Sequence, residues 1–108
     1  MNIENANTQM RRGVLELCIL SSLSHGDKYT NDLVNVLKEA AMIVVEGSIY
    51  PILTRLKNQG FLNYRWEESP QGPPRKYYSV TESGHAYLQQ LQEAWTAMVE
   101  TVNHLLED

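Results

Sequence analysis

Side chains that can bond to nucleic acid are concentrated in two short stretches of this 108-residue chain. The first stretch combines hydroxyl, guanidinium, ammonium and amide groups, which contact phosphates and base edges in protein–DNA complexes. Its candidate contact residues are Ser48, Tyr50, Pro51, Thr54, Arg55, Lys57 and Asn58. In the second stretch, Arg75 and Lys76 follow a tip rich in Pro and Gly, where positive charge favours the DNA backbone or the minor groove. These residue types predict recognition of double-stranded DNA, although ordinary solvation would explain Arg55 or Lys57 taken alone.

The distribution of charge agrees with this prediction, whereas the net charge of −4 does not. All nine Lys and Arg residues lie between Arg11 and Lys76, where seven acidic residues leave a balance of +2. From Tyr77 onward there are five acidic residues and no Lys or Arg. This asymmetry indicates a DNA-facing part and a separate acidic part, with accidental clustering on a solvated surface as the alternative. Arg11 and Arg12 either add contacts to the DNA backbone or pair with nearby acids.

Three helices precede the second basic stretch. The first is expected from Thr8, as N-cap, to Leu23, and its apolar residues cover most of its circumference, so it must be buried on more than one side. The second covers about residues 30–40. The third begins at Ser48, carries Pro51 in its first turn and ends at Gly60. The core-facing stripes of the second and third helices are Leu33, Val36, Leu37 and Ala40, and Ile49, Ile52, Leu53 and Leu56.

A β-hairpin follows, with strands over residues 62–67 and 75–80 and a turn over residues 69–74. Thr81 is the expected N-cap of a last helix that reaches about Leu106. This order predicts a mainly α fold with a small β-hairpin (α+β), a winged helix-turn-helix whose third helix enters the major groove. We expect a DNA-binding domain over residues 8–80 and a dimerisation helix over 81–106 in one compact unit, with residues 1–7 and 107–108 disordered.

The last helix carries apolar residues at intervals of 3, 4, 3, 4 and 3, which form a heptad seam. The seam residues are Leu88, Leu91, Trp95, Met98, Val102 and Leu105. Burial of one such side chain is worth about 1.5–3 kcal/mol, so six are too much apolar surface to leave in water. The seam therefore predicts a homodimer, whose two-fold symmetry would place two recognition helices in successive major grooves.

Trp95 has two interpretations, because a large flat ring fits a tight heptad seam poorly. In the first, Trp95 and its symmetry mate frame a slot for a small planar aromatic effector, lined also by Val14, Leu17, Cys18 and Met98. In the second, Trp95 is a core residue that packs against the first helix of the partner chain.

Several motifs together resemble the PadR family of transcriptional regulators, in particular its small members with a short C-terminal helix. They occupy residues 12–20, 45–53, 55–56, 60–62, 73–78, 80–81 and 84, in the family's order, so that the resemblance covers about residues 10 to 95. It implies a winged-helix dimer, usually a repressor, whose affinity for its operator falls when a small aromatic or hydrophobic effector binds. It also implies that Tyr50, Pro51 and Arg55 belong to the recognition motif. Residues 28–31 depart from the family's pattern at the start of the second helix, and residues 58–59 depart from it in a way that leaves the operator sequence open.

Other classes of function find little support. His25, His85 and His104 are scattered, and no nucleophile or phosphate-binding motif is present, so we expect neither an enzyme nor a cofactor or metal site. The single cysteine, Cys18, fits a small buried hydrophobe. The chain shows neither a signal peptide nor a membrane-spanning run, which predicts a cytoplasmic protein. The main alternative is a winged-helix module that binds proteins instead of DNA, which the acidic net charge favours.

Overall fold

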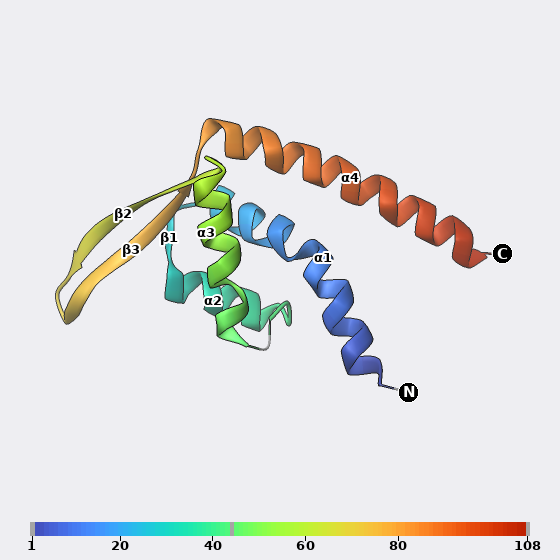
Figure 1. Cartoon of the computed structure of the whole chain (residues 1–108), viewed down its shortest axis with the longest axis horizontal. Helices are drawn as coiled ribbons and strands as arrows, with labels where there is room; N and C mark the ends of the chain where they lie inside the picture. The colour runs from blue at the N-terminus through green and yellow to red at the C-terminus, as the bar shows by residue number, and fades with distance from the viewer. Residues whose placement is uncertain (1, 44, 108) are drawn as a thin grey trace.

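The computed structural model describes residues 2–43 and 45–107 (Figure 1). It confirms the predicted α+β winged-helix architecture. The elements are α1 (Ile3–Ser24), β1 (Lys28–Tyr29), α2 (Thr30–Glu39), a 3₁₀ turn (Glu46–Ser48), α3 (Tyr50–Asn58), β2 (Leu62–Ser69), β3 (Gly72–Val80) and α4 (Glu82–Glu107). The hairpin is joined by β1, which the sequence pattern did not reveal, and the three antiparallel strands stand in the order β1-β3-β2.

The core lies where the C-terminal half of α1, α2, α3 and the base of the hairpin meet. Its fully buried side chains include Ile19, Leu20, Leu33, Val34, Ile49, Leu53, Leu56 and Leu62. The predicted stripe of α3 is confirmed, with Ile52 at its half-buried edge. The predicted stripe of α2 is wrong in part: Val34 is buried, while Val36 is 40% exposed and Ala40 is exposed.

Helix α1 begins earlier than the sequence pattern suggested. The Asn2 side chain accepts hydrogen bonds from the backbone N–H groups of Glu4 (3.1 Å) and Asn5 (3.4 Å) and is the N-cap. Thr8 is therefore inside the helix, and its hydroxyl donates to the carbonyl of Glu4 (2.9 Å). Residues 3–7, expected to be disordered, are helical, as is Glu107 at the other end of the chain. Met1 and Asp108, which shared that expectation, lie outside the described residues.

The start of α3 also differs from expectation. Ser48 belongs to the 3₁₀ turn, and its hydroxyl donates to the carbonyl of Val45 (2.7 Å), so it does not cap α3. The helix starts at Tyr50, and Pro51 occupies its first turn, where a missing N–H has no cost. Gly60 ends it as predicted, with a φ of +83° that glycine adopts without strain.

Helix α4 is fixed to the body at its first turns. The Thr81 side chain accepts from the N–H of Gly84 (3.0 Å), which confirms the predicted N-cap, and donates to the carbonyl of Gly60 (2.7 Å). Gly84 lies so close to Phe61 that a Cβ atom there would overlap the Phe61 carbonyl oxygen. The start of α4 and the end of α3 are therefore held together as one corner.

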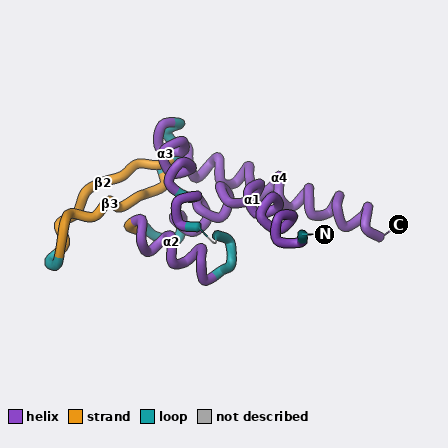
Figure 2. Tube along the Cα trace, turned by 60° about the horizontal axis from the view of Figure 1, so that its bottom comes forward, coloured by secondary structure: helices purple, strands orange, loops and turns teal. Residues whose placement is uncertain are grey.

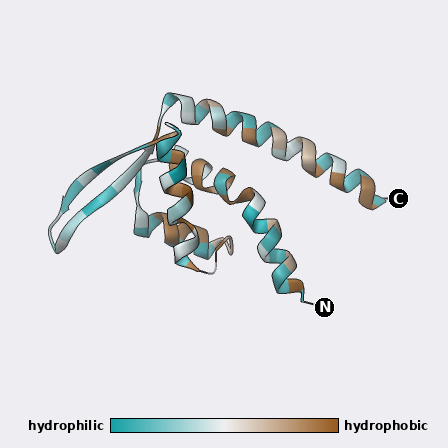
Figure 3. Cartoon of the chain, viewed as in Figure 1, coloured by the Kyte–Doolittle hydropathy of each residue, from teal (hydrophilic) through white to brown (hydrophobic). Residues whose placement is uncertain are grey.

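Beyond this corner, α4 and α1 form two arms that point away from the hairpin (Figures 1 and 2) and diverge in the view of Figure 1. The arms are the N-terminal half of α1 and the C-terminal half of α4, and hydrophobic residues recur along both (Figure 3). Their largest exposed apolar side chains are Ile3, Met10, Trp95, Met98, Val102, Leu105 and Leu106. The molecule is elongated in consequence, with extents of 57 × 33 × 21 Å.

Candidate nucleic-acid interface

The exposed face of α3 is set by the way the helix is anchored. Ile49, Leu53 and Leu56 are buried, and successive residues are about 100° apart around the axis. Thr54, Asn58 and Pro51 therefore lie on the side opposite the core, with Tyr50 beside them and 48% exposed. A shallow hollow on this side is lined by Gly47, Tyr50, Pro51, Thr54, Arg55, Asn58 and Gln59. Four of the predicted contact residues, Tyr50, Pro51, Thr54 and Asn58, thus share a surface of hydroxyl, amide and apolar groups, with the guanidinium of Arg55 at its edge.

The two cations of α3 lie at the edges of this face, and each has a partner within the chain. Arg55 Nη1 donates to Glu16 Oε1 of α1 at 2.8 Å. Lys57 Nζ lies 5.6 Å from the centre of the Tyr64 ring on β2, within the range of a cation–π interaction. Arg55 keeps 48% of its side chain exposed and also lines the hollow.

The hairpin carries a second surface next to Lys57, which we call the wing face. Its members, Tyr64, Trp66 and Lys76, share one side of the two strands, because Trp66 pairs with Lys76 and Tyr64 with Tyr78. Lys76 Nζ lies 4.0 Å from the centre of the Tyr64 ring and 5.6 Å from that of Trp66. Trp66 is 62% exposed. Tyr64 and Trp66 were not among the predicted contact residues, although their alternation along β2 already placed them on one side.

Arg75 and Lys76, predicted as a pair, point to opposite sides of the wing, as neighbouring residues of a strand must. The Arg75 guanidinium lies 4.6 Å from the centre of the Tyr29 ring on β1. Arg65 lies on the same side, where it donates to Asp27 (2.6 Å) and Glu67 (2.8 Å). Both hydrogen bonds raise the pKa of Arg65, and the one to Asp27 has the larger effect. Of Arg75 and Lys76, it is therefore Lys76 that lies on the wing face next to Lys57.

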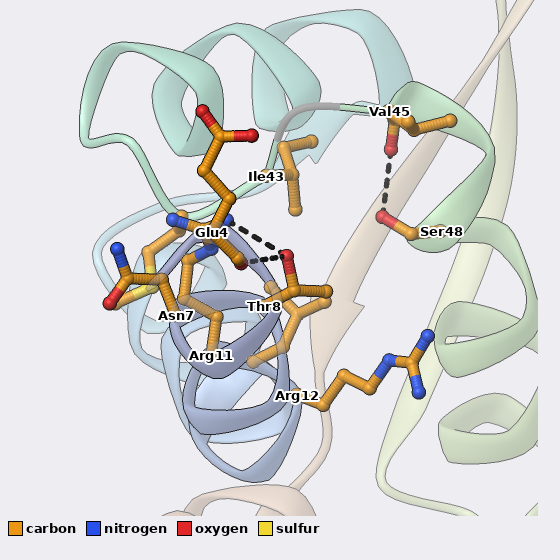
Figure 4. A pocket seen from close by; sticks show the side chains of 10 residues that line it. Glu4, Asn7, Thr8, Arg11, Arg12, Ile43, Val45 and Ser48 are labelled. Carbon is orange, nitrogen blue, oxygen red and sulfur yellow. Dashed lines mark hydrogen bonds between the residues drawn. The ribbon is translucent and has the colours of Figure 1, made fainter. Parts of the chain in front are cut away.

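Arg11, Arg12 and Ser48 lie apart from the exposed face of α3. They line a pocket of about 630 Å³ between α1 and the segment before α3 (Figure 4), whose lining also includes the buried residues Leu15 and Ile43. Arg11 Nη2 donates weakly to Thr8 Oγ1 (3.4 Å), and neither arginine forms an ion pair with a described residue. Figure 4 shows the Ser48 hydroxyl turned to Val45. The structure thus groups these residues with each other and not with Tyr50 and Thr54.

The predicted dimerisation seam divides into two parts. Leu88 is only 7% exposed and Leu91 is half-buried, and both pack against the core of their own chain. The assignment of Leu88 to a dimer contact is therefore wrong, because heptad spacing does not tell which turns of a helix cover their own domain. Farther along, Trp95, Met98, Val102 and Leu105 are between 44% and 67% exposed.

The five residues of the predicted effector slot line neither the hollow on α3 nor the pocket beside α1. Val14, Leu17 and Cys18 are half-buried on α1, while Trp95 and Met98 are exposed on α4. Burial raises the pKa of the Cys18 thiol, which keeps it protonated and unreactive. Within a single chain these residues lie on two helices, and each remains at least partly exposed.

Membrane spans and metal sites can be assessed for the part of the chain that the structure describes. No helix there is both long and apolar enough to cross a bilayer. No group of three or more His, Cys, Asp or Glu side chains is placed there to hold a metal ion.

Comparison with known proteins gives consistent matches. The model of the transcriptional regulator PadR-like family matches residues 19–90. A PadR-like transcription factor from Bacteroides fragilis is 51% identical, with a TM-score of 0.76 over 94% of this chain and 98% of that chain. A PadR family transcriptional regulator from Eggerthella lenta is 30% identical, with a TM-score of 0.89 over 97% and 92% of the two chains. A PadR-like transcriptional regulator from Bacillus cereus is 38% identical, with a TM-score of 0.79 over 93% and 98%.

Proposed function

Because the chain belongs to the PadR-like family of transcriptional regulators, we propose that it is a sequence-specific DNA-binding regulator that acts as a homodimer and represses transcription. The observation that carries the proposal is the exposed face of α3. A helix anchored by three buried side chains turns Tyr50, Thr54 and Asn58 outward, where hydroxyl and amide groups can read base edges in the major groove.

The wing face extends this surface. Lys57 and Lys76 supply positive charge beside α3, and the exposed ring of Trp66 offers an apolar surface to deoxyribose or to the minor groove. Arg75 would contact flanking DNA from the other side of the wing. Arg11 and Arg12 remain candidates for backbone contacts.

Dimerisation is supported by the two arms. The exposed parts of Trp95, Met98, Val102 and Leu105 together form an apolar surface that a second copy of α4 would cover. A two-fold axis along this seam would also bring the half-buried Val14, Leu17 and Cys18 toward Trp95. We propose a slot for a small planar aromatic effector between the two copies, since in one chain alone Trp95 and Met98 are exposed and the other three residues are only half-buried.

The function is tested by titrating genomic DNA fragments at increasing salt concentration. Three cations per protomer, Arg55, Lys57 and Lys76, adjoin the exposed face of α3 and the wing face, so a dimer would neutralise six phosphates through these residues alone, and contacts from Arg75, Arg11 or Arg12 would steepen the salt dependence. The slope of log K against log salt is then about −5, which corresponds to a loss of roughly 10³ in affinity between 50 and 200 mM salt.

Two variants separate base reading from general attraction. Replacing Thr54 and Asn58 together by Ala should reduce discrimination between operator and random DNA, by about 1–3 kcal/mol for each base that is no longer read. Asn35→Ala, an exposed amide on α2, is the matched control and should leave discrimination unchanged.

A winged-helix module that binds proteins is the second candidate. It is favoured by the net charge of −4 and by the intramolecular partners of Arg55, Lys57 and Lys76. Failure to bind any genomic fragment, even at the lowest salt concentration, would support this module and contradict the DNA-binding proposal.

A further inference from the structure

Glu16 lies where α1, α3 and α4 meet, and its two carboxylate oxygens serve different helices. Oε1 accepts the hydrogen bond from Arg55 Nη1 on α3 at 2.8 Å. Oε2 accepts a hydrogen bond from the Tyr87 hydroxyl on α4 at 3.3 Å. The Glu16 side chain is only 20% exposed, so one sheltered carboxylate joins the proposed recognition helix to both arm helices.

Tyr87 is itself held in place. Its ring stacks on Phe61 with centroids 4.2 Å apart and an interplanar angle of 10°. Phe61 directly follows Gly60, where α3 ends, and its carbonyl accepts from the N–H of Thr81 (3.1 Å). Burial, and then the negative charge of Glu16, raise the pKa of Tyr87, so the hydroxyl keeps its proton and remains a donor to Glu16.

Arg55 faces two ways. Its guanidinium is bonded to Glu16 on the inner side, yet the side chain is 48% exposed and lines the hollow together with Tyr50 and Thr54. A guanidinium has five N–H donors in a fixed plane, and Glu16 takes one of them. The other donors can reach a phosphate at the edge of the exposed face of α3. A long side chain that is already held loses less conformational freedom when it binds.

We propose that Glu16 is a positioning residue for DNA recognition: with Tyr87 behind it, it holds the Arg55 guanidinium in the orientation that contacts a DNA phosphate. This inference rests on the proposed function. Glu16 touches no DNA, and its role is exerted entirely through Arg55.

The test is a double-mutant cycle in operator binding with Glu16→Gln and Arg55→Gln. Removal of a negative charge strengthens DNA binding through long-range electrostatics, and this effect is common to both backgrounds, so the cycle cancels it. We expect Glu16→Gln to weaken binding by about fivefold or more when Arg55 is present, relative to its effect when residue 55 is Gln. Arg55→Gln should also make the salt slope shallower by about 0.9 for each phosphate that is no longer neutralised.

Two further variants and a check of folding and assembly guard against trivial explanations. Glu39→Gln, at the end of α2, removes the same charge without touching Arg55, and its effect should be equal in both backgrounds. Tyr87→Phe removes only the hydroxyl and should weaken binding in the same direction as Glu16→Gln, but less. Circular dichroism and sedimentation of each variant establish that the folded dimer is the species compared.

The outcomes are distinct. A zero coupling between positions 16 and 55, with DNA binding otherwise intact, means that the ion pair is merely structural and overturns the inference alone. A coupling of opposite sign, with Glu16→Gln strengthening binding more when Arg55 is present, shows that Glu16 competes with DNA for the arginine and overturns it as well. Absence of salt-dependent binding by the unmodified protein removes the proposed function and this inference with it.

Discussion

Replacement of Met98 by Glu tests the dimer most directly. Met98 is 57% exposed in the single chain and lies beyond the part of α4 that packs on its own core. Leu91 is less suitable, since it is half-buried against that core and its loss would also destabilise the fold. A charge at position 98 should therefore destabilise the proposed contact with a second copy without destabilising the fold of the single chain.

The magnitude follows from the exposed fraction. Full burial of a Met side chain is worth about 1.5–3 kcal/mol, so covering the exposed 57% contributes about 1–1.7 kcal/mol per copy. Loss of both copies costs the dimer about 2–3 kcal/mol, which raises the dissociation constant roughly 30- to 150-fold. Desolvation of two carboxylates adds several kcal/mol, so the total exceeds a factor of about 10³.

Sedimentation velocity over a range of protein concentrations measures this change. Gln89→Glu is the matched control, because Gln89 is exposed and lies roughly 150° around α4 from the centre of the seam. The substitution adds the same negative charge to α4 but outside the seam. We expect Gln89→Glu to remain a dimer and Met98→Glu to sediment as a folded monomer with weakened operator binding. A Met98→Glu dimer as tight as the unmodified protein would refute the assignment of the seam, as would an unmodified protein that is monomeric at micromolar concentration.

Two further predictions concern stability. Ala41 lies just after α2 with a φ of +58°, a conformation that costs an L-residue about 1 kcal/mol or more. Ala41→Gly should therefore raise the free energy of unfolding, measured by urea denaturation, by about 1 kcal/mol. An unchanged or lower midpoint would contradict this prediction. Burial and Glu16 raise the pKa of Tyr87 above its ordinary value near 10, so its contribution to stability is present below that pH and is lost as pH rises through the higher folded-state pKa. Between about pH 9 and 11 the unmodified protein should therefore lose stability faster than Tyr87→Phe, and parallel curves for the two proteins would rule out this titration.

Local signals in the sequence were enough to predict most of the fold. Apolar spacing identified the buried side of α3, Gly60 marked its end and Thr81 marked the start of α4. Each depends on residues within one or two turns of each other. At the start of α1 two residues of similar chemistry competed: Asn and Thr both cap helices well, and nothing local showed that Asn2 rather than Thr8 does so.

Features that depend on distant contacts could not be predicted in this way. Strand β1 has two residues, and its pairing with Tyr77 and Tyr78 joins segments about fifty positions apart. The partner of Arg55 is 39 positions away, so the sequence showed the arginine but not the carboxylate that holds it. The seam on α4 was predicted from its spacing and stays a prediction, whereas the assignment of Leu88 to the chain's own core requires the packed structure.

The contacts that join α3 to α4 would transmit a movement of α4 to α3 in the proposed response to an effector. Trp95 is eleven residues beyond Gly84, or about 17 Å along α4 at 1.5 Å per residue. A displacement of a few ångströms at Trp95 therefore tilts α4 by on the order of 10° about the corner at Gly84 and Phe61. Because α3 is fixed to that corner and is linked to Tyr87 of α4 through Glu16 of α1, it must follow the tilt or one of the two hydrogen bonds of Glu16, to Arg55 (2.8 Å) or to Tyr87 (3.3 Å), must break. Two recognition helices suit one operator only when they are about 34–36 Å, or a multiple of this distance, apart. In the proposed dimer, a ligand bound between the two copies would therefore change operator affinity without touching the DNA-facing surface.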